Sequence, residues 1–110
     1  MKQLILSALL LSGACQAQQA GQWIDLQQQD AAALFGEKCG MCHRANGMGT
    51  TILSRRQQGE LAILENRKDL TAELIEAVVR GGLGVMYPIS RGEVSDEQLD
   101  RIKQHLVNKQ

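Results

Sequence analysis

The pattern of hydrophobic and polar positions predicts three principal helices. In residues 70–81 and 96–108, apolar side chains recur at intervals of three and four, the spacing of one face of an amphipathic helix. A further helix is expected from about Asp30 into residues 39–43. Because no segment alternates convincingly with the period of a strand, we expect an all-α domain. The faces expected to point inwards consist of Leu34 and Phe35, of Leu74, Ile75, Val78 and Val79, and of Leu99, Ile102, Leu106 and Val107.

The ends of the second and third helices carry capping residues. Thr71 suits the N-cap of the second helix, and Gly81 suits its end. The third helix begins with a capping box, in which Ser95 and Gln98 each satisfy a backbone N–H of the other. Hydrophobic staples are expected to pair Leu70 with Ile75 and Val94 with Leu99.

Two connecting features precede the second helix. Residues 45–51 contain two glycines and predict a glycine-punctuated loop. A short amphipathic piece is expected around residues 60–65, with Leu61 and Leu64 pointing inwards.

The first 17 residues are typical of a secretory signal. Their apolar stretch, residues 4–11, is far shorter than the roughly 20 residues that a membrane-spanning helix needs. Two cleavage sites remain open: lipoprotein-type cleavage before Cys15, which would make Cys15 the lipidated first residue, and ordinary cleavage after Ala17. Either predicts a periplasmic protein, soluble or lipid-anchored, without a transmembrane segment.

Residues 18–29 are glutamine-rich and predict a tether, so the folded domain is expected at residues 30–110. The 12 basic and 12 acidic residues leave no electrostatic footprint for nucleic acid. Aromatic side chains are too few to fill a core, which suggests that a cofactor, a metal or disulfides do so. The three aromatic residues are Trp23, Phe35 and Tyr87.

The segment Cys39-Gly40-Met41-Cys42-His43 carries the candidate chemistry. C-x-x-C-H is the attachment pattern of c-type haem. Cysteines three residues apart lie about one helical turn from each other, so both sulfurs can reach the vinyl groups of one porphyrin. His43 would then offer its imidazole to the iron as the proximal ligand.

Three other interpretations of this segment fit less well. A thioredoxin-like redox pair should follow a buried strand, whereas residues 31–35 predict helix. A structural zinc site needs four ligands, and outside the segment only His105 remains in the mature chain. A disulfide across two intervening residues is strained and leaves His43 unexplained.

A second axial ligand can come from Met86 or His105. Met41 and Met48 lie too close to His43 to reach the opposite face of the ring without an abrupt turn. Met86 lies in a glycine-rich loop whose backbone can pass close to a porphyrin, and is the favoured ligand. A histidine and methionine pair raises the reduction potential, which suits an electron carrier.

Residues 30–108 resemble a small class I cytochrome c. The resemblance is carried by Phe35 four residues before the first cysteine, the motif at 39–43, the methionine loop at 81–88 and the closing helix at 96–108. It implies one covalently bound haem c, held by Cys39 and Cys42, with His43 and Met86 as axial ligands. It also implies that the first and last helices cross, with Phe35 at the contact.

A finer resemblance lies in residues 47–56 and 89–96. Both are similar to the cytochrome subunits that accompany flavoprotein hydroxylases of para-substituted phenols, such as p-cresol methylhydroxylase and eugenol hydroxylase. This implies an exported electron-transfer protein, without chemistry of its own, that serves as acceptor or subunit of a periplasmic flavoprotein oxidoreductase. The alternative is a haem-based peroxidase or gas sensor in which Met86 is displaced.

The sequence departs from the family pattern at three places. Tyr87 separates Met86 from Pro88, and Thr50 and Thr51 stand where a proline is usual. The last helix carries His105 where an aromatic residue is common. Candidate partners of the haem propionates are Arg55, Arg56 and Arg80. Residues expected to pack around the porphyrin are Leu53, Leu61, Leu64, Leu74, Val78 and Leu99.

Overall fold

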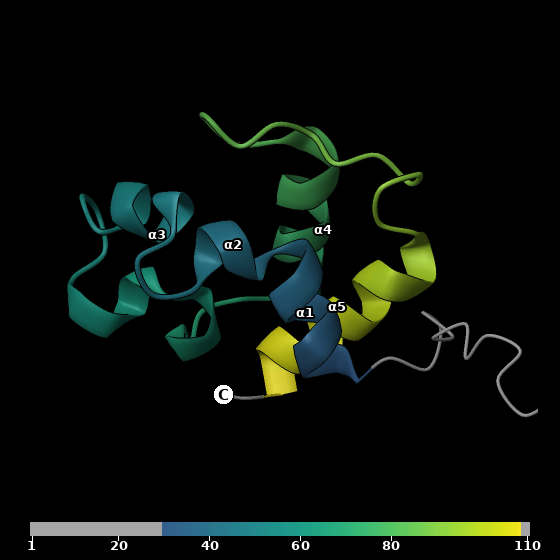
Figure 1. The fold of residues 1–110 in the computed structure, drawn as a ribbon, viewed down its shortest axis with the longest axis horizontal. Coiled ribbons are helices and arrows are strands. Elements are labelled where there is room, and N and C mark those ends of the chain that lie inside the picture. The colour runs from purple at the N-terminus through teal and green to yellow at the C-terminus, as the bar shows by residue number, and fades with distance from the viewer. Residues whose placement is uncertain (1–29, 109–110) are drawn as a thin grey trace, which may run out of the picture.

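The computed structural model describes residues 30–108, whose elements are all helices apart from one isolated bridge between Leu83 and Met86 (Figure 1). The longest helices are α1, α4 and α5, so the prediction of an all-α domain with three principal helices is confirmed. The expected signal, Cys15, and the tether with Trp23 lie outside the described residues. The elements in chain order are α1 (Ala31–Lys38), α2 (Gly40–His43), α3 (Met48–Leu53), the 3-10 helices η1 (Gly59–Ala62) and η2 (Leu64–Asn66), α4 (Ala72–Gly81) and α5 (Asp96–Asn108).

The core forms where α5 packs against α1 and α4, and α1 crosses α5 in Figure 1. Leu34 and Phe35 of α1 are fully buried, and the Phe35 ring contacts His105 of α5. The expected contact of Phe35 with the last helix is therefore confirmed. The other buried apolar residues of this cluster are Leu70, Ile75, Val79, Val94, Leu99, Ile102 and Leu106.

The predicted helix caps are present. The Thr71 hydroxyl accepts the Leu74 N–H at 3.2 Å at the start of α4. At α5 the Ser95 N–H donates to Gln98 Oε1 at 3.0 Å, and the Gln98 N–H donates to Ser95 Oγ at 3.2 Å. These reciprocal bonds form the expected capping box and fix the entry of the chain into α5.

Two details differ from the sequence expectations. The first helix does not run continuously into the motif, because Cys39 leaves helical geometry at φ −125° and α2 starts one residue later. Leu61 was expected to point inwards, and this is wrong: it is 45% exposed. It lies in the single turn of η1, which is too short to present an apolar stripe, while Leu64 packs against the core.

The predicted loop at residues 45–51 is helical in its second half, since α3 begins at Met48. Gly47 and Gly49 allow α3 to pack closely against α2. A Cβ at Gly47 would stand 2.8 Å from the Met41 carbonyl oxygen, and a Cβ at Gly49 would stand 2.8 Å from the Cys42 carbonyl oxygen. The missing side chains let α3 lie directly against the backbone of α2.

Candidate functional site

A cavity of about 340 Å³ lies among the helices, within the size range of small-molecule and cofactor sites. Its walls are almost entirely apolar, and every helical element in residues 30–108 contributes to them except the 3-10 helix η1. Leu74 and Val78, which were expected to point inwards, line this cavity, and the 43% exposure of Leu74 reflects its open side. The apolar lining residues are Phe35, Ile52, Leu53, Leu64, Leu70, Leu74, Ile75, Val78, Val79, Leu83, Val85, Ile102 and Leu106.

Three of the four predicted site residues line this cavity. Cys39 lies at the junction of α1 and α2, His43 ends α2, and Met86 lies in the loop between α4 and α5. Cys42 is half-buried on α2 and is not among the lining residues. The Cys39 carbonyl accepts the N–H groups of both Cys42 and His43, at 3.1 and 3.0 Å. One turn of chain therefore carries both thiols and the imidazole.

The two cysteines are free thiols in this structure. Burial, and to a smaller extent the neighbouring Cys42, raises the pKa of Cys39 to about 11. Cys39 therefore stays protonated at neutral pH and is a poor thiolate nucleophile. This argues against a thioredoxin-like role for the pair, which needs a cysteine with a lowered pKa.

His43 is in the state that a metal ligand requires. Burial lowers the pKa of its imidazole, which favours the neutral ring. Its Nδ1 atom is buried and has no hydrogen-bond partner.

Met86 is held by a tight backbone turn. The Leu83 N–H donates to the Met86 carbonyl at 2.9 Å, and the Met86 N–H donates to the Leu83 carbonyl at 3.0 Å. Gly84, inside the turn, has φ +60°, which a glycine adopts without strain. Gly82, just before it, has φ +76°, and a Cβ there would stand 2.7 Å from the Met86 carbonyl oxygen.

His105, the alternative second ligand, does not line the cavity. Its Nε2 lies 2.8 Å from Glu65 Oε1, and its ring packs on Phe35. Met86 is therefore the candidate that the structure brings to the cavity together with His43.

The arginines expected to meet carboxylates of a cofactor lie elsewhere. Arg55 and Arg56 are exposed beyond α3, and none of Arg55, Arg56 and Arg80 lines the cavity. The Arg80 guanidinium bonds to two carbonyls and to Asp96 instead. Its Nε is buried without a partner.

Arg67 is the cationic side chain that lines the cavity among the described residues, and the sequence did not single it out. It forms a bidentate pair with Asp69, with Nε 2.8 Å from Oδ1 and Nη2 2.5 Å from Oδ2. The pair holds the guanidinium at the cavity wall just before α4. An R-x-D pattern ahead of a helix cap is the signal that could have identified it.

These residues fit a haem. The unpartnered Nδ1 lies on a neutral imidazole, a thioether shares its cavity, two thiols lie one turn apart, and the walls are apolar. They do not fit a four-ligand zinc site, because residues 30–108 contain no group of three or more His, Cys, Asp and Glu side chains placed to hold a metal ion.

Residues 26–106 match a protein-family model described as "Cytochrome C oxidase, cbb3-type, subunit III". No curated protein and no solved structure matches the chain. None of the helices in residues 30–108 has the length and apolar character needed to cross a membrane.

Proposed function

We propose that this chain, which belongs to the cytochrome c oxidase, cbb3-type, subunit III family and is thus a haem-containing electron-transfer cytochrome, binds one haem c through Cys39, Cys42, His43 and Met86. The observation that carries the assignment is one apolar cavity shared by Cys39, His43 and Met86. These residues come from different parts of the chain, so the cavity links the attachment motif to the methionine loop.

The chain's own residues account for the requirements of electron transfer. When bound, haem supplies a one-electron iron couple. The neutral imidazole of His43 and the thioether of Met86 offer two ligands fixed to separate backbone elements, so both can keep their positions in either oxidation state. The apolar walls exclude water, and a thioether ligand favours a high reduction potential. Arg67, paired with Asp69, can donate to a carboxylate at the cavity wall.

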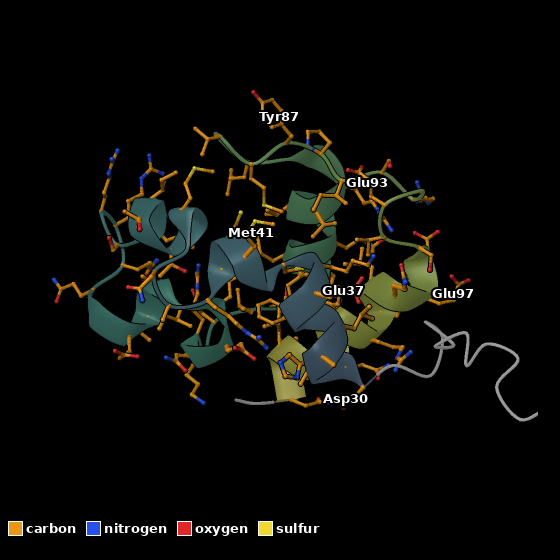
Figure 2. The ribbon with its side chains drawn as sticks, viewed as in Figure 1. Asp30, Glu37, Met41, Tyr87, Glu93 and Glu97 are labelled. Carbon is orange, nitrogen blue, oxygen red and sulfur yellow. The ribbon has the colours of Figure 1, made fainter. Side chains whose placement is uncertain are left out.

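The redox partner in this proposal is a periplasmic flavoprotein oxidoreductase acting on phenols. Support comes from the resemblance of residues 47–56 and 89–96 to the cytochrome subunits of such enzymes. Exposed apolar side chains near the site suit a largely neutral contact: Met41 on α2 is 86% exposed and Tyr87 beside Met86 is 85% exposed (Figure 2). Residues 1–17 serve as the export signal, and Cys15 is either lipidated or removed with it.

Haem attachment and ligation are tested on the protein purified from the bacterial periplasm. Intact mass should give the chain plus one haem, and Cys39→Ser together with Cys42→Ser should abolish the covalent adduct. Met86→Ala should remove the weak long-wavelength band of methionine-ligated ferric haem. A wild-type protein without that band, or a band that survives Met86→Ala, would refute the ligation.

Carbon monoxide binding separates an electron carrier from a peroxidase or gas sensor. The reduced wild-type protein should resist carbon monoxide at neutral pH, because Met86 would compete for the iron. Rapid, tight binding would instead favour the catalyst or sensor. The partner is tested by following haem reduction after mixing with a phenol-oxidising flavoprotein and its substrate, with substrate omitted as the control.

A further inference from the structure

The loop that carries Met86 is weakly held by its own side chains. Leu83 and Val85 line the cavity, and Tyr87 is 85% exposed, so packing of these side chains against the neighbouring helices contributes little to the order of this segment. Its backbone is fixed instead at its two ends. The turn between Leu83 and Met86 closes one end, and the Ile89 N–H, which donates to the Val79 carbonyl at 2.8 Å, ties the other end to α4.

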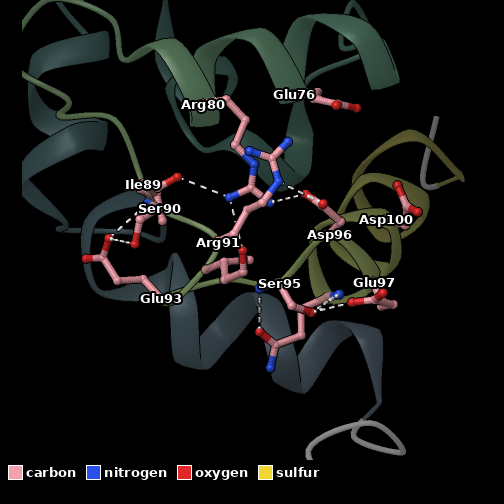
Figure 3. Close-up of polar contacts among 12 residues, drawn as sticks. Glu76, Arg80, Ile89, Ser90, Arg91, Glu93, Ser95, Asp96, Glu97 and Asp100 are labelled. Atoms are coloured by element: carbon pink, nitrogen blue, oxygen red, sulfur yellow. Dashed lines mark hydrogen bonds and ion pairs between the residues drawn. The ribbon is translucent and has the colours of Figure 1, made fainter.

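Arg80 binds the same end of the loop from the last turn of α4 (Figure 3). Its Nη1 donates to the Ile89 carbonyl at 3.1 Å and to the Val94 carbonyl at 3.0 Å. Ile89 is thus held to α4 twice, through its N–H by Val79 and through its carbonyl by Arg80. Only two residues, Tyr87 and Pro88, separate Met86 from Ile89, and Pro88 has a fixed φ.

The same guanidinium also joins this segment to the start of α5. Arg80 Nη2 donates to Asp96 Oδ1 at 2.8 Å, and the side chain of Arg80 is only 15% exposed. Glu93 closes the intervening turn by accepting the Ser90 N–H at 2.9 Å. One side chain therefore connects α4, the end of the methionine loop and the first turn of α5, and its loss would leave backbone carbonyls without a partner.

We propose that Arg80 is a positioning residue for Met86: by pinning Ile89 and Val94 to α4 and α5, it keeps the methionine loop at the cavity that would hold the haem. The proposal rests on the proposed function, in which Met86 is an axial ligand. Without Arg80 the loop opens more often, and an external ligand displaces the thioether more easily. Removal of one to two hydrogen bonds should change such a local opening equilibrium by about tenfold.

The test uses the haem-loaded protein and measures the affinity of the ferric form for added imidazole. Arg80→Gln should increase this affinity by about tenfold. Arg80→Lys should give a smaller increase, because its ammonium can still donate to the carbonyls. Arg91→Gln is the matched control. Arg91 also binds Asp96, with Nε 2.8 Å from Oδ2, but makes no bond to the carbonyls of the loop.

A second control separates loop opening from global instability. Thr71→Ala removes the N-cap at the far end of α4 and should lower global stability without changing the affinity for imidazole. Unchanged imidazole affinity in Arg80→Gln would overturn the proposal, as would an equal rise in Thr71→Ala. If Arg80→Gln does not fold, Arg80→Lys alone decides, since its affinity must exceed that of wild type.

Failure of the proposed function gives a different result. In that case the wild-type protein already lacks the methionine-dependent ferric band, or Met86→Ala retains it, and the role of Arg80 falls with it. A wild-type protein with the band, together with Arg80 variants that bind imidazole as wild type does, overturns the positioning role alone.

Discussion

His105 Nε2 lies 2.8 Å from Glu65 Oε1, while the His105 ring packs on Phe35 with the ring centroids 5.6 Å apart. One side chain of α5 therefore contacts both α1 and η2. Glu65 also lies 3.5 Å from Arg44, which follows the candidate axial ligand directly in the chain. The chain of contacts from His105 through Glu65 to Arg44 joins α5 and η2 to the residue after the attachment motif. None of these three side chains lines the cavity.

Replacing His105 should separate its ring packing from its hydrogen bond. His105→Phe keeps the ring but loses the bond to Glu65, and should cost about 1 kcal/mol of the free energy of unfolding. His105→Ala also loses the buried ring and should cost about 2–4 kcal/mol. Denaturant unfolding of the haem-loaded protein measures both, and Gln104→Ala, at an exposed neighbouring position, should leave stability unchanged. Equal losses for Phe and Ala would contradict the role of the ring.

Gly49 should not tolerate a side chain. A Cβ there would stand 2.8 Å from the Cys42 carbonyl oxygen and 3.1 Å from His43 Cε1, so Gly49→Ala should push α3 away from the imidazole and destabilise the protein by about 1–3 kcal/mol. Gly81→Ala is the control, because no atom lies within 4 Å of its Cβ and alanine favours helix. We expect Gly81→Ala to be neutral or stabilising by up to about 1 kcal/mol. Thermal unfolding compares the two variants.

Local signals in the sequence predicted the helices and their caps because each depends on a few neighbouring residues. Thr71, Ser95 and Gln98 make the predicted bonds, and Phe35 makes the predicted contact with α5. The glycines at 47 and 49 were interpreted as loop punctuation, whereas they permit close packing of α3 on α2. That contact depends on how two helices meet, which no local pattern encodes.

The placement of the candidate site residues was predictable where their spacing in the sequence determines geometry. It was not predictable where partners distant in the sequence determine it. The motif predicted Cys39, Cys42 and His43 on one turn, and the glycine-rich loop indicated Met86 at the same site. The arginines were not predictable in this way. Arg80 finds its partners in carbonyls of Ile89 and Val94, and Arg67 reaches the cavity wall through its pair with Asp69.

Protonation of Asp96 should lower the stability of the protein in acid. Its hydrogen bond from Arg91, and a smaller contribution from Arg80, hold the pKa of its carboxyl below the ordinary value. Such a group stabilises the fold at pH above its unfolded pKa of about 4, and the contribution disappears as pH falls through the lower folded pKa. Asp96→Asn should therefore be less stable than wild type at neutral pH and match it in strong acid. Melting temperature measured across this range checks the convergence, and a constant difference would refute it.

Arg67 should raise the reduction potential of the bound haem. A cation at the cavity wall stabilises the reduced iron, which carries one positive charge less, so Arg67→Leu should lower the midpoint potential. Asp69, left without its bidentate partner, adds to the same effect. Spectroelectrochemical titration measures the potential, with Arg55→Leu as an exposed control that does not line the cavity. A fall of the same size in both variants would assign the effect to overall charge.

The turn from Leu83 to Met86 lets the position of the candidate iron ligand and the composition of the neighbouring surface vary independently. Its two reciprocal bonds use backbone atoms only, so they do not require a particular side chain at position 87. Of the two side chains that flank Met86, Val85 lines the cavity, whereas Tyr87 is 85% exposed and is free to diversify. Gly82 is constrained by the approach of the Met86 carbonyl. The surface at Tyr87 can therefore change by mutation while the backbone turn that positions Met86 stays the same.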